Sequence, residues 1–226
     1  MYKYELHAHT SECDRDAHLS ARELVHLYKN AGYDGMVITD HSIERFYTLW
    51  FPEEVQGLNH EQQVTRWLRG FRTAREEGEK IGFTVLPGAE VRFDHYPNDY
   101  LLYGLQEDFF YTVPRLNELS GVSELLSLMP QGVCVVHAHP FRDGMAVATP
   151  TGLFGMEVFN GGTDAFRNEL ARRFAAHYGL AVTSGSDIHD LTRLAKGGIE
   201  TERRIRTPED LISVLRSGAY RLIENE

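Results

Sequence analysis

Histidine and carboxylate residues recur in pairs at short spacing along the chain. His7 and His9 are separated by one residue, and Asp14 follows five residues later. Side chains alternate between the two faces of an extended segment, so His7 and His9 would share a face and could bind one metal ion together. Asp187 and His189 repeat this spacing as a mixed pair. Each pair, taken alone, is equally compatible with ordinary hydrogen bonding at the end of a strand.

Three further positions place imidazole or carboxylate groups directly after apolar segments, namely Asp40-His41, Glu90 and His139. Alone, Asp40 could simply orient its neighbour, and Glu90 could be a solvated loop acid. The complete set of candidate ligands is His7, His9, Asp14, His41, Glu90, His139, Asp187 and His189. This set exceeds one tetrahedral site and suffices for two or three ions that share a bridging carboxylate. Mixed imidazole and carboxylate ligands suit Mn, Zn or Fe.

The candidate ligands follow short apolar runs that predict strands. These runs lie at residues 2–6, 35–39, 83–86, 100–103, 132–136, 156–159 and 180–183. Helices are predicted after a capping box at Ser20 and Glu23, over residues 61–80 and 166–178, and after Thr207 with Pro208 in the first position. Strands that alternate with helices pair in parallel, and barrels of parallel strands build their active sites at the carboxyl ends. We therefore expect one α/β domain over residues 1–226, a barrel smaller than the usual eight-fold form.

Five ordered motifs resemble those of the PHP (polymerase and histidinol phosphatase) metallophosphoesterases. They are Glu5-Leu6-His7-Ala8-His9-Thr10 with Asp14, Ile38-Thr39-Asp40-His41, Gly88-Ala89-Glu90, Ala138-His139-Pro140 and Gly185-Ser186-Asp187-Ile188-His189. The resemblance implies a distorted (β/α)7 TIM-like barrel with a metal cluster at its C-terminal rim. Two or three divalent ions (Mn, Zn or Fe) would bind there, up to a trinuclear centre.

The resemblance also implies how the ligands divide among the ions. By motif position, the first ion would be held by His7, His9, Glu90 and Asp187, the second by Glu90 and His139, and the third by Asp14, His41 and His189. Many family members carry a further histidine about ten residues after the shared glutamate. Asp99 stands at that place in this chain, and His95 is the competing candidate. We expect Asp99 to be the additional ligand of the second ion.

The activity implied by the resemblance is hydrolysis of a phosphomonoester, or a cyclic or other phosphodiester, by a metal-bridged hydroxide. We expect Arg142 to hold a phosphoryl oxygen through its planar guanidinium. Asp40 would orient a ligand or carry a proton to the leaving group. The expected catalytic residues are Asp40, Arg142 and His189. Arg15, Arg193 and His137 are further candidates for substrate contact, and His137 would face the same side of its strand as His139.

Two other functions remain open. Amidohydrolase-type enzymes, which cleave C–N or lactone bonds, also use a His-x-His pair on a first barrel strand. Their sites often bridge two ions with a modified lysine, whereas none of the lysines here (Lys3, Lys29, Lys80 and Lys196) ends a predicted strand. The other possibility is a metal-binding module without catalytic activity. Residues 45–59 follow the Asp40-His41 motif and form either a lid over the pocket or a helix packed on the barrel.

Charge and composition restrict the substrate. Acids outnumber bases 33 to 23, which gives a formal net charge of −10. Such a surface repels phosphate polymers, so we expect a small phosphorylated metabolite or nucleotide rather than a nucleic acid. The N-terminus lacks the apolar core of a signal peptide, and no apolar run approaches the roughly 18 residues of a membrane span, so a cytoplasmic location without a membrane partner is expected. The oligomeric state is left open.

Overall fold

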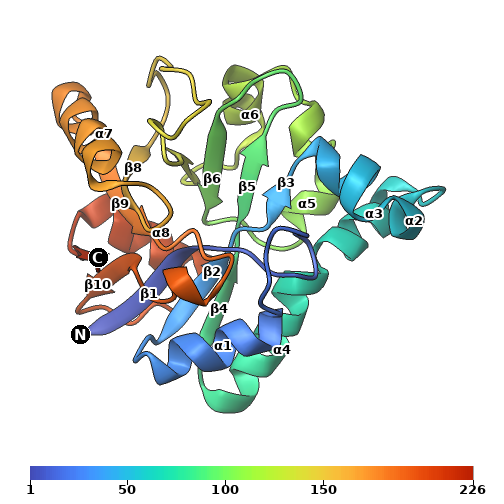
Figure 1. Ribbon diagram of the computed structural model, residues 1–226, viewed down its shortest axis with the longest axis horizontal. Helices are drawn as coiled ribbons and strands as arrows, with labels where there is room; N and C mark the ends of the chain where they lie inside the picture. The colour runs from blue at the N-terminus through green and yellow to red at the C-terminus, as the bar shows by residue number, and fades with distance from the viewer. Residues whose placement is uncertain (226) are drawn as a thin grey trace.

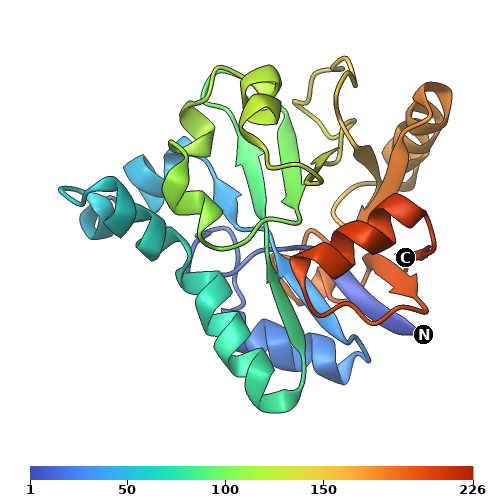
Figure 2. The same ribbon diagram turned by 180° about the vertical axis from the view of Figure 1, so that it is seen from behind.

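The computed structural model describes residues 1–225, which form a mixed α/β fold with two sheets and surrounding helices (Figures 1 and 2). The first sheet has five strands in the order β11-β10-β1-β2-β4. Their bounds are β1 Tyr2–Ala8, β2 Gly35–Ile38, β4 Thr84–Pro87, β10 Gly197–Thr201 and β11 Arg221–Glu224. The second sheet has six strands in the order β3-β5-β6-β7-β8-β9. Their bounds are β3 His41–Ser42, β5 Ala89–Arg92, β6 Asp99–Tyr103, β7 Cys134–His137, β8 Gly155–Asn160 and β9 Ala181–Gly185.

Helices lie outside the two sheets in both views (Figures 1 and 2). The α-helices are α1 Ala21–Asn30, α2 Pro52–Val55, α3 His60–Trp67, α4 Arg69–Ile81, α5 Phe109–Thr112, α6 Val122–Leu128, α7 Ala165–Tyr178 and α8 Pro208–Ser217. A π-helical turn covers Phe46–Trp50, and short 3-10 turns cover Leu116–Glu118 and Leu191–Arg193. Within residues 1–225, no helix combines the length and the apolar character needed to cross a membrane.

The start signals in the sequence place the helices well. Ser20 caps α1 through a capping box with Glu23, and Thr207 caps α8 with Pro208 in its first turn. All seven predicted strands are present as β1, β2, β4, β6, β7, β8 and β9. The helix predicted over residues 61–80 is instead two helices, because the chain breaks at Leu68 between α3 and α4.

The expected closed barrel is not found among the described residues, and the expectation that the strands all pair in parallel is wrong. Parallel pairing holds for β1-β2-β4 and for β7-β8-β9. However, β6 runs antiparallel to both β5 and β7, and β10 runs antiparallel to β1. Only residues 93–98 separate β5 from β6, too few for the crossover that parallel strands need. The sequence analysis did not identify β5, so this hairpin and its reversal of direction were missed.

One continuous segment passes from the first sheet into the second at Gly88. Strand β4 ends at Pro87 and β5 begins at Ala89, so Glu90 is carried to the place where the sheets meet. A Cβ atom on Gly88 would lie 2.6 Å from Val37 Cγ1 and 2.9 Å from the Leu102 carbonyl oxygen. Only glycine fits there, which explains the Pro-Gly pair in front of the glutamate.

The interior below this junction is filled with apolar side chains. Leu6, Leu101, Tyr103 and Val136 are buried in one cluster that joins strands of both sheets. The Tyr103 hydroxyl donates a hydrogen bond of 3.1 Å to the Leu6 carbonyl oxygen, so the ring spans the interior without an unpaired polar group. This dense packing limits the movement of the strands whose ends meet at the junction.

Candidate metal centre

Three overlapping groups of imidazole and carboxylate side chains lie at the junction of the two sheets, and all of these side chains are buried except His189, which is partly exposed. Within each group the candidate ligand atoms lie within 4.8 Å of one another. The first group is His7, His9, Glu90 and Asp187, the second is Glu90, Asp99 and His139, and the third is His9, Asp14, His41 and His189. The structure therefore brings together all nine residues that the sequence analysis named as metal ligands. It adds His9 to the third group.

Glu90 lies at the centre of the groups. Its Oε2 atom is 3.2 Å from both His7 Nε2 and His9 Nε2, and 3.1 Å from His41 Nδ1. Its Oε1 atom is 2.8 Å from His139 Nε2. A carboxylate with neighbours on both oxygens is suited to bridging two ions.

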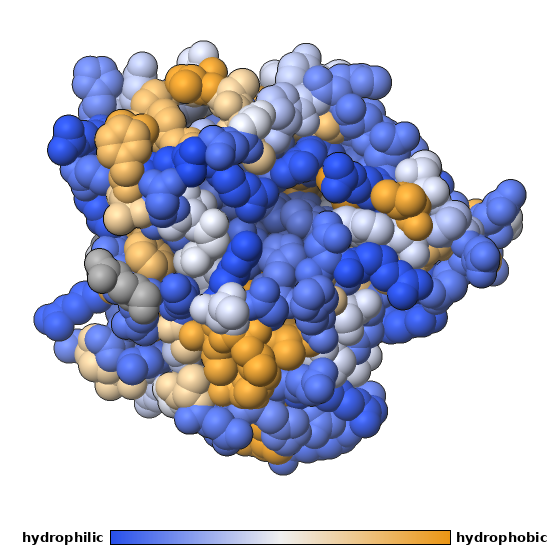
Figure 3. All heavy atoms as spheres, in the orientation of Figure 1, coloured by the Kyte–Doolittle hydropathy of each residue, from blue (hydrophilic) through white to orange (hydrophobic). Residues whose placement is uncertain are grey.

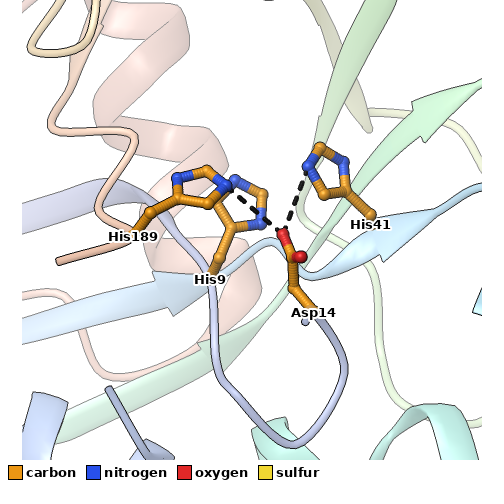
Figure 4. A group of neighbouring side chains, drawn as sticks. All are labelled: His9, Asp14, His41 and His189. Atoms are coloured by element: carbon orange, nitrogen blue, oxygen red, sulfur yellow. Dashed lines mark ion pairs between the residues drawn. The ribbon is translucent and has the colours of Figure 1, made fainter. Parts of the chain in front are cut away.

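Asp14 brings the loop after β1 into the third group (Figure 4). Its carboxylate lies between two rings, with Oδ2 at 3.3 Å from His189 Nε2 and 3.5 Å from His41 Nε2. The backbone N–H of Asp14 donates to the Thr10 carbonyl oxygen, and Oδ1 accepts from the Asp16 N–H. These bonds hold the loop so that Oδ2 faces the histidines.

Two of the candidate ligands adopt unusual backbone conformations. His139 has φ of 26° and Asp187 has φ of 50°, values that non-glycine residues rarely adopt. Each residue lies two positions after the end of a strand, β7 or β9, and the turn in the backbone redirects its side chain. Strain of this kind persists where the surroundings hold it, and it concentrates at functional sites.

Several buried polar atoms of the groups lack hydrogen-bond partners within residues 1–225. They are His7 Nε2, His9 Nδ1, His9 Nε2, Asp14 Oδ2, His41 Nδ1, Glu90 Oε2 and His139 Nδ1. Leaving such atoms unpaired costs about 1–3 kcal/mol each, and more for charged groups. Three of these nitrogens, His7 Nε2, His9 Nε2 and His41 Nδ1, lie 3.1–3.2 Å from Glu90 Oε2 without hydrogen-bond geometry, as ligand atoms arranged around a common ion would. The residues therefore fit divalent metal ions.

The charges of the groups are strongly coupled. Burial by itself lowers the pKa of His7 and His9, but nearby carboxylates outweigh burial, those of Glu157, Glu90 and Asp187 at His7 and those of Asp187 and Glu90 at His9. The pKa of His7 is raised well above its ordinary value, with Glu157 contributing most, and that of His9 is raised to about 10. In contrast, burial dominates at His41 and lowers its pKa to about 3. Burial opposes ionisation of Glu90 and Asp187, yet the neighbouring histidines hold the pKa of both carboxyls well below the ordinary range.

Arginines approach the open side of the groups. Arg142 Nη1 lies 3.0 Å from Asp187 Oδ2, and its Nη2 lies 3.6 Å from Asp99 Oδ2. Arg193 Nη1 donates to the Asp187 carbonyl oxygen at 2.9 Å and lies 3.3 Å from Oδ2. Arg92 forms a two-point ion pair with Asp99, in which Nε lies 2.6 Å from Oδ1. All three guanidinium groups are partly exposed, so they line the entrance.

The structure distinguishes between the two candidates for the additional ligand. Asp99 is fully buried and belongs to the second group, whereas His95 is exposed in the β5–β6 hairpin and lies outside all three. Strand β6 begins at Asp99, and its register with β5 sets Asp99 opposite Arg92.

Arg15 and Asp40 lie beside the groups rather than within them. The guanidinium of Arg15 stacks over the Phe51 ring at 4.6 Å, and its Nε donates to the Trp50 carbonyl oxygen. Asp40 accepts hydrogen bonds from the N–H and hydroxyl of Thr10, at 2.7 and 2.9 Å. Burial raises the Asp40 pKa to about 7, although His9 and the Thr10 bonds oppose the shift. Asp40 thus holds the chain next to His9.

His137 does not face the ligand groups, so the expectation that it shares a face with His139 is wrong. Strand β7 ends at His137, and the positive φ of His139 breaks the alternation of side chains. His137 is paired in register with Tyr100, and their rings stack with centroids 5.2 Å apart. It is a packed core histidine.

Replacing His137 with phenylalanine is expected to reduce the sensitivity of the fold to acid. Burial lowers the His137 pKa to about 4, so its protonation opposes folding. The unfolded chain takes up this proton near its ordinary pKa of about 6.5, whereas the folded chain takes it up only near pH 4. The free energy of unfolding is therefore at its full value above about pH 6.5 and falls as the pH drops toward 4. Urea unfolding at pH 7 and pH 5 should show that the free energy of unfolding falls by about 2 kcal/mol less in the variant than in the wild type. The exposed His177→Gln variant is the control, and equal acid losses in wild type and His137→Phe would contradict the assignment.

Residues 45–59 pack on the protein and also reach the site. Phe46, Trp50 and Phe51 are buried, and the Trp50 ring lies 6.0 Å from the ring of His41. Leu49 in the same π-helical turn is exposed. The surface on this side is hollowed near its centre, and hydrophilic residues gather around the hollow (Figure 3). The segment therefore packs on the rest of the fold, and it also lies beside the third ligand group.

Three charged residues support the candidate ligands in a role that was not predicted from the sequence. Buried Glu5 accepts hydrogen bonds from the backbone N–H groups of His7 and Ser186. Buried Glu157 contacts the His7 ring, and Arg92 pairs with Asp99. The only available signal was an acid inside an otherwise apolar strand, as in Met156-Glu157-Val158-Phe159, where charge is unfavourable unless it is paired.

The family comparison matches about a quarter of the chain, near its C-terminal end. A family model described as PHP-associated matches residues 166–220, which contain Asp187 and His189. No curated protein matches the sequence.

Solved structures share the fold at low sequence identity. A two-domain protein from Bacteroides vulgatus, described as containing a predicted PHP-like metal-dependent phosphoesterase, is 17% identical with a TM-score of 0.69. The match covers 99% of this chain, which spans 65% of that protein. A provisionally described metal-dependent phosphoesterase from Bifidobacterium adolescentis is 16% identical with a TM-score of 0.54, covering 94% of this chain and 95% of that one. An amidohydrolase from Chromobacterium violaceum, with bound sulfate and no metal, is 14% identical with a TM-score of 0.59, covering 94% and 96%.

Proposed function

Taking as premise that the chain belongs with the PHP proteins, as the PHP-associated match and the shared fold support, we propose that it is a metal-dependent phosphoesterase. It hydrolyses a phosphomonoester or a cyclic or other phosphodiester of a small metabolite or nucleotide. The observation that carries the proposal is the set of three overlapping ligand groups around Glu90, which belongs to two of them and contacts His41 of the third.

The residues around the groups have separate tasks in this reaction. Two or three divalent ions, of Mn, Zn or Fe, would lower the pKa of water and neutralise charge on phosphoryl oxygens. Arg142 and Arg193 present their guanidinium groups at the open side, where they would bind the remaining phosphoryl oxygens and orient the ester. Arg92 adds a third positive charge at the same entrance.

Asp40 and His189 differ in how easily a leaving group could reach them to receive a proton. The side chain of His189 is 17% exposed beside the third group, so a leaving group could reach it. The Asp40 carboxylate is engaged by Thr10 and buried. We therefore assign Asp40 the orienting role and leave His189 as a candidate both for binding a metal and for protonating the leaving group.

A small substrate fits the charge of the molecule better than a polymer does. The chain carries a formal net charge of −10, which repels nucleic acid at a distance. Three guanidinium groups, those of Arg92, Arg142 and Arg193, lie at the entrance, where they contact the carboxylates of Asp99 and Asp187. A phosphate group on a small molecule can reach them without placing further phosphates over the acidic surface.

An amidohydrolase-type reaction is the second candidate, because one structure with the same fold is named an amidohydrolase. The ligand groups argue for the phosphoesterase. Within residues 1–225 Glu90 is shared by the first two groups, where its carboxylate would take the bridging role, and no lysine belongs to any of the three groups. The purified protein loaded with each metal should be assayed on phosphomonoesters, phosphodiesters, amides and lactones. Turnover of amides or lactones alone would overturn the proposal, and so would no turnover at all.

Replacing Arg142 with alanine is expected to lower kcat/KM by about 10²-fold without loss of bound metal. The guanidinium would contact the phosphoryl group, and loss of one such preorganised donor typically costs 10²–10³-fold. Metal content by elemental analysis and kinetics on the best phosphoester would be measured together. Arg173→Ala, on the exposed face of α7, is the matched control. An Arg142→Ala variant with wild-type kinetics would remove Arg142 from the substrate site.

A further inference from the structure

We propose that Glu157 is a positioning residue that fixes the ring tautomer of His7 and thereby makes His7 able to bind a metal ion. The inference rests on the proposed metal-dependent function, because it concerns the same ligand groups. Glu157 lies on β8, is 1% exposed, and belongs to none of the motifs in the sequence.

Every polar contact of the Glu157 carboxylate is with a hydrogen-bond donor. Oε1 lies 2.8 Å from His7 Nδ1. Oε2 accepts from the backbone N–H of His139 at 3.0 Å and from Asn160 Nδ2 at 2.8 Å. An ionised carboxylate has no proton to donate, so the His7 Nδ1 facing it must carry a hydrogen.

The close approach of Glu157 to His7 depends on Gly185 in the neighbouring strand β9. A Cβ atom on Gly185 would lie 2.3 Å from His7 Cβ and 2.6 Å from Glu157 Oε1. Any larger residue would push the ring and the carboxylate apart. The glycine, the histidine and the glutamate come from three strands, β9, β1 and β8, so the contact is built by the fold and not by local sequence.

The chemical consequence appears at the other ring nitrogen. With the hydrogen on Nδ1, deprotonated His7 presents the lone pair of Nε2 to its surroundings. Nε2 lies 3.2 Å from Glu90 Oε2 and 3.5 Å from Asp187 Oδ1, within the first ligand group. Carboxylates that hold the distal nitrogen of a ligand histidine in this way set its orientation and raise its basicity.

The same carboxylate also fixes a residue of the second group. The N–H that Oε2 accepts belongs to His139, whose φ of 26° lies outside the regions that non-glycine residues prefer. Holding that N–H stabilises the turn that directs the His139 ring toward Glu90. One carboxylate therefore positions two candidate ligands on two strands, β1 and the end of β7.

Glu157→Gln is the sharpest test, because it keeps the shape and removes one acceptor. Two donors, from His139 and Asn160, meet at the Oε2 end, so the amide oxygen is expected to remain there. The amide NH2 then faces His7 Nδ1, which must become an acceptor, and the hydrogen moves to Nε2. A protonated Nε2 cannot bind a metal. We expect a 10–100-fold loss of affinity at the first group, measured by competition of Mn²⁺ with a chelator.

Nitrogen-15 NMR of the zinc-loaded protein gives a readout that does not depend on activity. In the wild type, His7 is expected to carry its hydrogen on Nδ1, and in Glu157→Gln on Nε2. The control is Glu5→Gln, which changes another buried carboxylate that accepts from the His7 backbone and not from its ring. This control should leave the His7 tautomer unchanged.

The outcomes separate this inference from the proposed activity. Unchanged Mn²⁺ affinity and an unchanged tautomer in Glu157→Gln would overturn it. If the variant fails to fold, the wild-type spectrum alone decides, because a hydrogen on His7 Nε2 in the zinc-loaded protein is incompatible with it. A protein that binds metal but cleaves no ester would refute the phosphoesterase and would still show the expected tautomer change.

Discussion

Replacing Glu90 with alanine should abolish most metal binding and reduce phosphoester hydrolysis by about 10³-fold or more. Glu90 belongs to two ligand groups and contacts His41 of the third, so its loss affects all of the positions at once. Metal ions stabilise charge in a phosphoryl transition state by several kcal/mol, and each 1.36 kcal/mol is worth tenfold in rate. Elemental analysis after dialysis and kinetics under saturating metal would be measured on the same preparations.

Two further variants separate the chemistry of Glu90 from its packing. Glu90→Gln keeps the volume and one acceptor atom, so it should retain the fold while losing the bridging charge. Glu169→Ala, on the exposed surface of α7, removes a carboxylate far from the groups and should retain metal and activity. Circular dichroism would verify folding in each case. Full activity and full metal content in Glu90→Ala would refute the phosphoesterase and the central place of this residue.

The candidate ligands were visible in the sequence because each lies on, or within a few residues of, a strand that the pattern of apolar residues reveals. His7, Asp187 and His139 needed only a strand prediction and a motif to be named. A pattern of apolar residues predicts only the conformation of its own segment. Strand alternation predicted that His137 and His139 share one face. Instead, the positive φ of His139 turns the chain, and the His137 ring packs against Tyr100.

Residues whose role depends on distant partners were not visible in this way. Glu157 reaches His7 across 150 positions of the sequence, and the contact requires the missing side chain at Gly185. Arg92 contacts Asp99 because β5 and β6 form a hairpin, and that hairpin also reverses the strand direction expected of a barrel. The helix signals at Ser20 and Thr207 were reliable because capping is local. Sheet closure and strand direction are not local, and both were mispredicted.

Metal binding at pH 7 is expected to release at least two protons, one each from His7 and His9. Carboxylates raise the pKa of His7 well above its ordinary value and that of His9 to about 10, so both rings are protonated before metal binds. His41, whose pKa burial lowers to about 3, is already neutral and contributes no proton. Ligand imidazoles must be deprotonated, so the affinity for Mn²⁺ should rise by about two decades per pH unit near neutrality. Calorimetry in two buffers of different ionisation enthalpy measures the protons directly.

The same histidines make the stability of the metal-free protein and that of the metal-bound protein depend on pH in opposite directions. The pKa of His9 is raised on folding, so its contribution to the metal-free fold is complete below about pH 6.5 and is lost as the pH rises toward 10. Bound metal replaces the protons, and its contribution grows over that same range. The increase in Tm caused by Mn²⁺ should therefore be larger at pH 8.5 than at pH 6.5. A smaller increase at pH 8.5, or a proton release near zero at pH 7, would show that metal does not displace protons from His7 and His9.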